Sequence, residues 1–171
     1  MKYDEKDIIY KEIENKMNKK IKELKKIYQA TIDAGEPINF HSKCDNIPNT
    51  LVLIKSENNR RFGGFTPIPW KSEEKEIWLN DKDDKTFVFS LDNKKIYYLN
   101  IIHVTAVYHN KGNGPCFGGG CDIGISGNPI KEDTLYTRQS SCFYYKGDSK
   151  SLSEYDIFSK GKGLEYEVIF Y

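Results

Sequence analysis

The sequence predicts an α+β fold built on antiparallel β-sheet, and three observations support this prediction. Helical periodicity is confined to the first quarter of the chain. The rest consists of short apolar runs separated by turn residues. No helical segment lies between these runs, whereas a doubly wound parallel sheet would need them there. The length of 171 residues fits one domain, and the 13% aromatic content is typical of a chain that folds.

A helix is predicted over residues 4–28, a segment without proline or glycine. Apolar side chains recur there at spacings of three and four, which places them on one face: Ile9, Ile13, Met17, Ile21 and Leu24. Such a stripe must be buried, either against this chain or against a partner. We therefore divide the chain into an N-terminal amphipathic helix, residues 1–26, which packs on the domain or on a partner, and a domain of residues 27–171.

A turn at residues 34–37 precedes a short second helix, which is expected at residues 39–44. After this helix the pattern changes to short apolar runs, which are typical of strands. Strands are predicted at residues 51–55, 61–70, 85–91, 95–101, 121–126, 142–145 and 166–171. Residues 103–108 either extend the strand at 95–101 or form a short strand of their own. Residues 92–93 fit the turn of a hairpin. Residues 110–120 are predicted to form a glycine-rich loop, and the segment 127–163 is polar and rich in turn residues.

The charge of the chain argues against nucleic acid as a partner. The formal net charge is +1 and the sequence pI is about 7.6, whereas nucleic-acid-binding domains usually carry a basic face or a higher pI. Lysines are concentrated in residues 16–26, but Glu12, Glu14 and Glu23 dilute them. We interpret this basic run as a solvated helix face.

The hydropathy pattern predicts a cytoplasmic protein. The N-terminal residues contain no apolar core of a signal peptide. No run approaches the roughly eighteen apolar residues of a membrane span, so no membrane insertion is expected. Without secretion, Cys44, Cys116, Cys121 and Cys142 are expected to remain reduced thiols.

Residue patterns for catalysis or metal binding are weak in this sequence. Cys116 and Cys121 have nearly the spacing of a zinc-binding pair, but a second pair is missing, so free thiols are the favoured interpretation. The chain has no Gly-x-Ser-x-Gly motif and no paired carboxylates in a recognisable frame. We therefore expect no enzyme, no catalytic residue, no metal ion and no cofactor.

Two glycine clusters are interpreted as structural. A run of three glycines before Cys121 could present backbone amides to a phosphate. However, Cys121 and Asp122 stand where a P-loop has a lysine and a hydroxyl residue. Glycine also permits sharp turns and close backbone approach. The expected structural glycines are Gly63, Gly64, Gly118, Gly119 and Gly120.

Several stretches together resemble the TLDc domain, the family of the oxidation resistance proteins. The strongest likeness is NTLVLIKSENNRRFGGFTPIPW (49–70), with its FGG(F/Y)T motif and following tryptophan. Further likenesses are INFHSKCDN (38–46), DDKTFVFSLDNKKIYYL (83–99), GPCFGGGCDIGIS (114–126) and GLEYEVIFY (163–171). The resemblance covers about residues 20–171. Cys121 stands where many members have histidine, and residues 32–37 replace the usual RDG turn.

This resemblance implies a two-layer antiparallel β-sandwich flanked by a few helices, with the N-terminal helix at its front. It also implies a domain without established catalytic residues. Protection from oxidative damage and binding to the vacuolar-type proton pump, the V-ATPase, are the functions that it implies.

On this basis we expect a non-catalytic protein-interaction domain that docks on a large complex as a structural component or a regulator. The expected partners are protein subunits of such an assembly, either a proton pump or a cytoskeletal complex. The protein would then lie in the cytoplasm, attached to a large cytoskeletal or membrane-associated complex. The alternative is a cysteine-dependent antioxidant protein, for which Cys44 and Cys116 are the candidate reactive thiols.

The candidate partner-binding residues are of two kinds. Tryptophan, tyrosine and arginine often anchor protein interfaces, which selects Trp70, Trp78, Tyr144, Tyr145, Arg60 and Arg61. The apolar stripe of the N-terminal helix adds Ile9 and Ile13.

Overall fold

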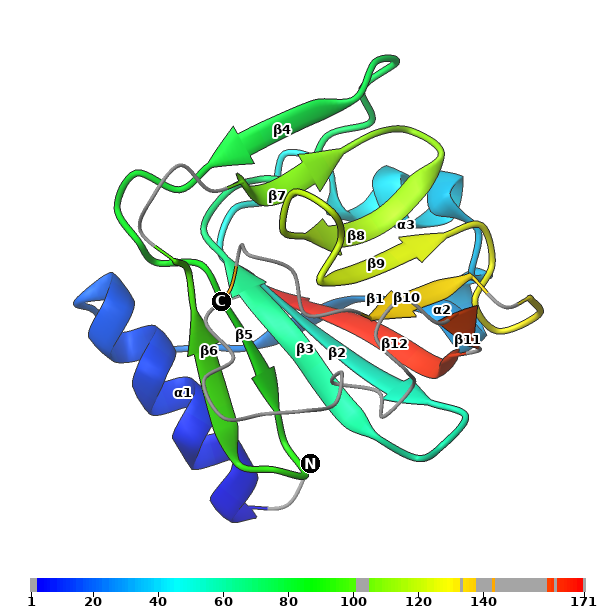
Figure 1. Cartoon of the computed structure of the whole chain (residues 1–171). Helices are drawn as coiled ribbons and strands as arrows, with labels where there is room; N and C mark the ends of the chain where they lie inside the picture. Colours follow the sequence, from blue (N-terminus) through cyan, green and yellow to red (C-terminus); the bar gives the residue numbers. More distant parts are fainter. Residues whose placement is uncertain are drawn as a thin grey trace.

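Two antiparallel sheets facing each other form the body of the protein (Figure 1). The structure is a computed structural model and describes residues 3–100, 105–132, 134–137, 143, 160–161 and 163–170. In these residues each sheet has six strands, and three helices pack around the sheets. The predicted α+β fold, a two-layer antiparallel sandwich with an N-terminal helix, is confirmed.

The helices are α1 (Tyr3–Met17), α2 (Ala30–Asp33) and α3 (Pro37–Cys44). The first sheet contains, in spatial order, β1 (Lys25–Gln29), β12 (Gly163–Phe170), β2 (Thr50–Ser56), β3 (Arg61–Thr66), β5 (Phe87–Ser90) and β6 (Lys95–Tyr98). The second sheet contains β11 (Lys160–Gly161), β10 (Leu135–Thr137), β9 (Ile123–Ser126), β8 (Asn113–Phe117), β7 (Thr105–His109) and β4 (Ile77–Asn80). Among the described helices, none has the length and apolar character needed to cross a bilayer.

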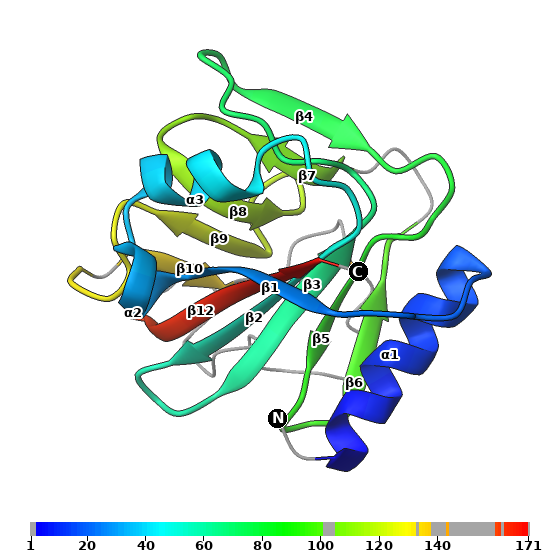
Figure 2. The same ribbon diagram turned by 180° about the vertical axis from the view of Figure 1, so that it is seen from behind.

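The first sheet contributes to two separate cores. Side chains alternate along a strand, so the successive residues Leu51 and Val52 of β2 belong to different cores. Val52 lies in the main core with Trp70, Phe117 and Tyr166, between the two sheets. Leu51 lies in a second core beneath α1, with Ile9, Ile13, Phe65, Phe87, Phe89 and Leu91. Figure 2 shows α1 alongside β5 and β6. Strand β5 therefore consists of buried residues only, as expected for a strand covered on both faces.

Helix α1 is shorter than predicted. It ends at Met17, and Asn18 adopts a left-handed φ of 50°, which commonly terminates a helix. Residues 25–29 form strand β1, so the helical prediction over residues 18–28 is wrong. The physical reason is pairing between β1 and β12, a strand from the other end of the chain. The spacing of apolar residues within one segment carries no information about such a partner.

Several strand boundaries also differ from the prediction. β3 ends at Thr66 because the two prolines in residues 67–70 cannot donate to a sheet ladder. Strand β8 lies inside the predicted loop 110–120, and strands β4, β10 and β11 were not predicted. The predicted strand at residues 142–145 lies outside the described residues, apart from Phe143, which forms an isolated antiparallel bridge with Leu99.

The cysteines differ from the prediction as well. Cys116 and Cys121 form a disulfide, so the expectation of four reduced thiols is wrong for this pair. The turn between β8 and β9 brings their Cα atoms to 5.4 Å, within the range for a disulfide. Cys44 is a free, buried thiol. Cys142 lies outside the described residues.

Candidate functional site

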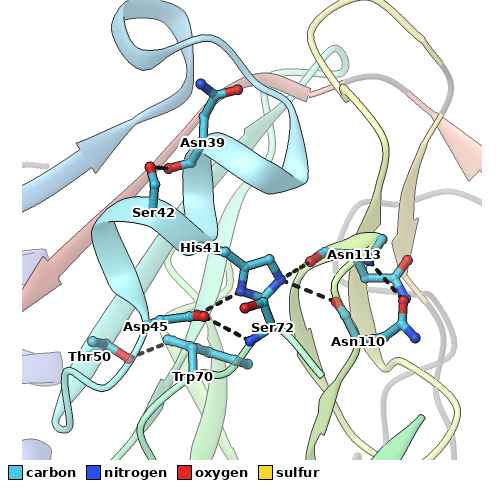
Figure 3. A network of polar contacts seen from close by, with 10 residues as sticks. Asn39, His41, Ser42, Asp45, Thr50, Trp70, Ser72, Asn110 and Asn113 are labelled. Atoms are coloured by element: carbon cyan, nitrogen blue, oxygen red, sulfur yellow. Dashed lines mark hydrogen bonds and ion pairs between the residues drawn. The ribbon is translucent and has the colours of Figure 1, made fainter. Parts of the chain in front are cut away.

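A network of polar contacts fixes one corner of the sandwich, where α3 meets the connection between β7 and β8 (Figure 3). We call it the α3 corner, and it consists of Ile38, His41, Asp45, Ser72, Asn110 and Asn113. His41, in the last turn of α3, is at its centre. Its Nδ1 lies 2.7 Å from Asp45 Oδ1. Its Nε2 lies 2.9 Å from the carbonyl oxygen of Asn113 and 3.2 Å from that of Asn110.

The second carboxylate oxygen of Asp45 is also used. It accepts a hydrogen bond from the backbone N–H of Ser72 at 2.8 Å. The next residue, Asn46, donates its backbone N–H to the Trp70 carbonyl oxygen at 2.9 Å. The Trp70 indole N–H in turn donates to Thr50 Oγ1 at 2.9 Å. The end of α3 is thereby linked to the segment after β3 as well as to β7 and β8.

Both ring nitrogens of His41 are engaged. Carboxylate and carbonyl oxygens are acceptors only, so the ring N–H of His41 has an acceptor of its own chain in either tautomer. Ser42 Oγ donates to the Asn39 carbonyl oxygen at 2.8 Å and points away from the histidine ring (Figure 3). The Cys44 thiol is buried, and this burial raises its pKa. A thiol in such surroundings is mostly protonated and weakly nucleophilic.

A shallow depression of about 500 Å³ lies over the α3 corner. Its lining residues are Ile38, His41, Ser42, Asp45, Ser72, Glu74 and Lys111. The charged groups are already paired, since Lys111 Nζ lies 2.5 Å from Glu74 and His41 contacts Asp45. Ile38, in the first turn of α3, is 74% exposed. The depression thus combines one large exposed apolar side chain with polar groups held in place by their neighbours.

The family model for the TLDc domain matches residues 1–160 of the 171-residue chain. The match runs from α1 to the start of β11 and includes the α3 corner. The chain belongs to the TLDc domain family. The membership predicted from the sequence motifs is confirmed. A sequence comparison with curated proteins finds no match.

Beneath the α3 corner of this TLDc domain, His109 is buried beside Trp70, with the ring centroids 5.8 Å apart. Only 2% of its surface is exposed, and neither ring nitrogen has a hydrogen-bond partner among the described residues. Burial lowers the pKa of His109 to about 4, although the Asp45 carboxylate opposes this shift. Within the described part of the chain, no group of three or more His, Cys, Asp or Glu side chains could hold a metal ion.

Three of the predicted partner-binding residues are buried in the TLDc domain itself. Trp70 lies in the main core, and Ile9 and Ile13 lie in the second core beneath α1. These side chains present no surface to a partner, because they pack against other residues of the same domain. The apolar stripe of α1 therefore packs on its own domain. Trp78, on the edge strand β4, is 50% exposed and contacts Tyr108 with ring centroids 5.5 Å apart.

The remaining candidate partner-binding residues are either engaged within the chain, partly buried, or outside the described residues. Arg61 binds Asp92 of the neighbouring hairpin, with an Nη2 to Oδ1 distance of 2.7 Å. Arg60 is half-buried. Tyr144 and Tyr145 lie outside the described residues.

The glycines of the two clusters lie at close contacts and turns. A Cβ on Gly63 would collide with the Val52 carbonyl oxygen of the adjacent strand. A Cβ on Gly64 would lie 2.7 Å from the Phe117 ring of the opposite sheet. Gly118 has a φ of +83°, in the region that favours glycine, whereas Gly119 and Gly120 complete the turn before Cys121.

Sequence reasoning did not select His41, Asp45 or Ile38 as site residues, although all three lie in the motif INFHSKCDN. The spacing of four residues between His41 and Asp45 could have identified this pair, since residues four apart on a helix are neighbours. The contacts of Nε2, in contrast, are made by Asn110, in the connection between β7 and β8, and by Asn113, at the start of β8. The exposure of Ile38 depends on the tertiary placement of α3.

Proposed function

We propose that this TLDc domain is a non-catalytic protein-interaction domain that docks on a large assembly as a structural component or a regulator. The observation that carries the proposal is Ile38, which is 74% exposed on a helix whose end is fixed by several polar contacts. A V-ATPase is one candidate assembly, and this candidate comes from the family resemblance alone.

The α3 corner has the properties of a preorganised docking surface. An apolar side chain on a rigid element loses little conformational freedom when it is buried by a partner. His41 and Asp45 hold α3 against two other segments, so Ile38 is presented in one orientation. The ion pair between Lys43 Nζ and Asp33 Oδ1, at 2.7 Å, adds a link between α3 and α2.

The same contacts support a non-catalytic role. A general base needs a nitrogen with a lone pair directed at its substrate. Both nitrogens of His41 instead face acceptor oxygens of their own chain. The neighbouring thiol of Cys44 is fully buried.

The test is native co-purification of the tagged full chain with Ile38→Asp, followed by the mass of the native complex. Ile32→Asp on α2 is a matched control, because Ile32 is 75% exposed and does not line the depression. We expect the wild type and Ile32→Asp to co-purify with a large assembly in fixed stoichiometry, and Ile38→Asp to remain alone. A wild-type chain that is found only at its own mass would contradict docking.

A second candidate function, cysteine-dependent oxidation resistance, is favoured by the disulfide between Cys116 and Cys121. In its reduced state this pair could donate two electrons and two protons to one peroxide molecule, giving the disulfide and two water molecules. Cys121 is half-buried, whereas Cys116 is fully buried, so Cys121 is the thiol that peroxide would reach first.

This alternative is tested by peroxide consumption with the reduced wild type and with Cys116→Ser/Cys121→Ser. Cys44→Ser is the control, because Cys44 forms no disulfide and is buried. If the pair is the reductant, the double variant loses peroxide consumption and the control keeps it. Equal rates in all three proteins would exclude the alternative.

A further inference from the structure

A basic pocket of about 360 Å³ lies where the end of α1, the connection to β1 and the end of β12 meet. Its lining residues are Lys19, Lys20, Lys22, Glu23, Lys25 and Phe170. Figure 2 shows this connection running from the last turn of α1 back to β1. The pocket is separate from the α3 corner and shares no lining residue with it.

Local folding after α1 brings these lysines together. The Glu14 carboxylate accepts a hydrogen bond from the Ile21 backbone N–H at 3.0 Å and pairs with Lys20 Nζ at 2.7 Å. These contacts turn the chain back on the helix. The pairing of β1 with β12 then places Lys25 opposite Phe170. A continuous helix would distribute the lysines around its circumference, whereas this fold directs them toward one pocket.

Positive charge is in excess at the pocket, which is lined by four lysines and one glutamate. Lys20 pairs with Glu14, but Lys19, Lys22 and Lys25 form no ion pair with any described residue. Residues 16–26 contain six lysines and one glutamate, a formal charge of +5, so the rest of the chain carries −4. The pocket is therefore a local positive region on a protein that is otherwise negative.

We propose that this basic pocket binds an acidic segment of a protein partner, with carboxylates near Lys19, Lys22 and Lys25 and one apolar side chain on Phe170. Lysine ammonium groups are mobile point charges, which suit a flexible run of Asp and Glu better than a ligand of fixed geometry. A nucleic acid or an anionic bilayer would extend beyond the pocket toward the rest of the chain, whose formal charge is −4. The inference deepens the proposed docking function by naming the chemistry of the partner.

The test measures binding of the full chain to a short fluorescein-labelled peptide of Asp and Glu around a central leucine, by fluorescence anisotropy. We expect the affinity to fall with added salt. We also expect it to fall at least about tenfold in Lys19→Glu/Lys22→Glu/Lys25→Glu. The control, Lys55→Glu/Lys82→Glu/Lys131→Glu, makes the same change in net charge at residues that line neither this pocket nor the depression over the α3 corner, and it should bind like the wild type.

Three results would overturn the proposal. The first is equal affinity of the wild type and the pocket variant for the acidic peptide, and the second is equal affinity of the wild type for a peptide with Asn and Gln in place of Asp and Glu. The third is tighter binding of the wild type to phosphatidylserine vesicles or to a single-stranded oligonucleotide than to the acidic peptide. Thermal unfolding of each variant checks that the domain is folded. The assay uses purified protein, so it can fail while docking through Ile38 persists. Conversely, if the wild-type chain does not co-purify with an assembly, the peptide assay can still show whether the pocket binds acidic segments.

Discussion

At the scale of single residues, a buried pair of tyrosines joins the first and last strands of the chain. Tyr28 OH donates to the Ala34 carbonyl oxygen at 3.1 Å. Its oxygen therefore accepts the hydrogen bond of Tyr166, at 2.8 Å. Burial raises the pKa of Tyr28 to about 12 and that of Tyr166 further, so both remain neutral. Because Tyr28 both donates and accepts a hydrogen bond, its hydroxyl group should contribute more to stability than that of Tyr166.

Removing the Tyr28 hydroxyl should cost more stability than removing the Tyr166 hydroxyl. Tyr28→Phe leaves the buried Tyr166 hydroxyl without its acceptor, which we expect to cost about 1–3 kcal/mol. Tyr166→Phe leaves the bond from Tyr28 to Ala34 intact, and we expect about 1 kcal/mol or less. Urea unfolding of the two variants and the wild type measures both values. The reverse order would show that the donors are assigned wrongly.

His109 predicts a loss of stability in mild acid. Burial lowers its folded-state pKa from 6.5 to about 4, so below pH 6.5 the unfolded chain binds a proton that the folded protein does not. The stabilisation is complete above pH 6.5 and is lost as the pH falls toward 4. The free energy of unfolding should fall by a total on the order of 3 kcal/mol, at about 1.4 kcal/mol for each unit by which burial lowers the pKa of His109.

The free energy of unfolding, measured between pH 7.5 and 4, checks this prediction against His109→Phe. Phenylalanine keeps an aromatic ring beside Trp70 and has no titrating group. The difference in stability between the variant and the wild type should therefore shift in favour of the variant as the pH falls. A difference that stays constant over this range would count against the burial of a neutral His109.

At the scale of elements, α1 is attached by its buried face. Ile13 is 1% exposed in the second core, whereas Ile8 on the same helix is 38% exposed. We expect Ile13→Ala to cost about 2–4 kcal/mol because it leaves a cavity, and Ile8→Ala to cost about 1 kcal/mol or less. Thermal or urea unfolding compares the two. Similar costs would mean that α1 does not pack as described.

Strand β3 shows how one glycine sets the distance between the sheets. The Phe117 ring of the second sheet occupies the space that a Cβ on Gly64 would need. We expect Gly64→Ala to destabilise the domain by about 1–3 kcal/mol. Gly114→Ala is the control, since its Cβ would meet Ile125 at an ordinary 3.5 Å. Urea unfolding should show the loss for Gly64→Ala and little change for Gly114→Ala.

At the scale of the whole molecule, the first sheet couples the two cores. Adjacent residues of β2, Leu51 and Val52, point into different cores, so neither core can open while the strand stays in place. We therefore expect one cooperative unfolding transition. In a Trp78→Phe background, fluorescence of buried Trp70 reports the main core, and circular dichroism at the helical minimum reports α1. The two urea transitions should coincide, and an earlier loss of helix would show independent cores.

The order of strands is also a property of the whole molecule, and local patterns located several strands without predicting their order. Apolar runs located β2, β5, β6 and β9, because the strand signal of each lies within one contiguous segment. Strand β1 was predicted as helix, since its apolar spacing fits both structures and its pairing with β12 decided between them. At the α3 corner, the family motif that contains His41 was recognised, but the contacts of its Nε2 come from Asn110 and Asn113, which are 69 and 72 residues further along the chain.

The sequence by itself determined the fold class and the family, because strand periodicity, turn residues and the TLDc motifs are properties of contiguous segments. Only the tertiary structure decided which apolar residues are covered. Ile9, Ile13 and Trp70 were candidates for a partner and are buried, whereas Ile38 was passed over and is exposed. Exposure depends on packing between segments far apart in the chain, and local spacing does not encode that packing.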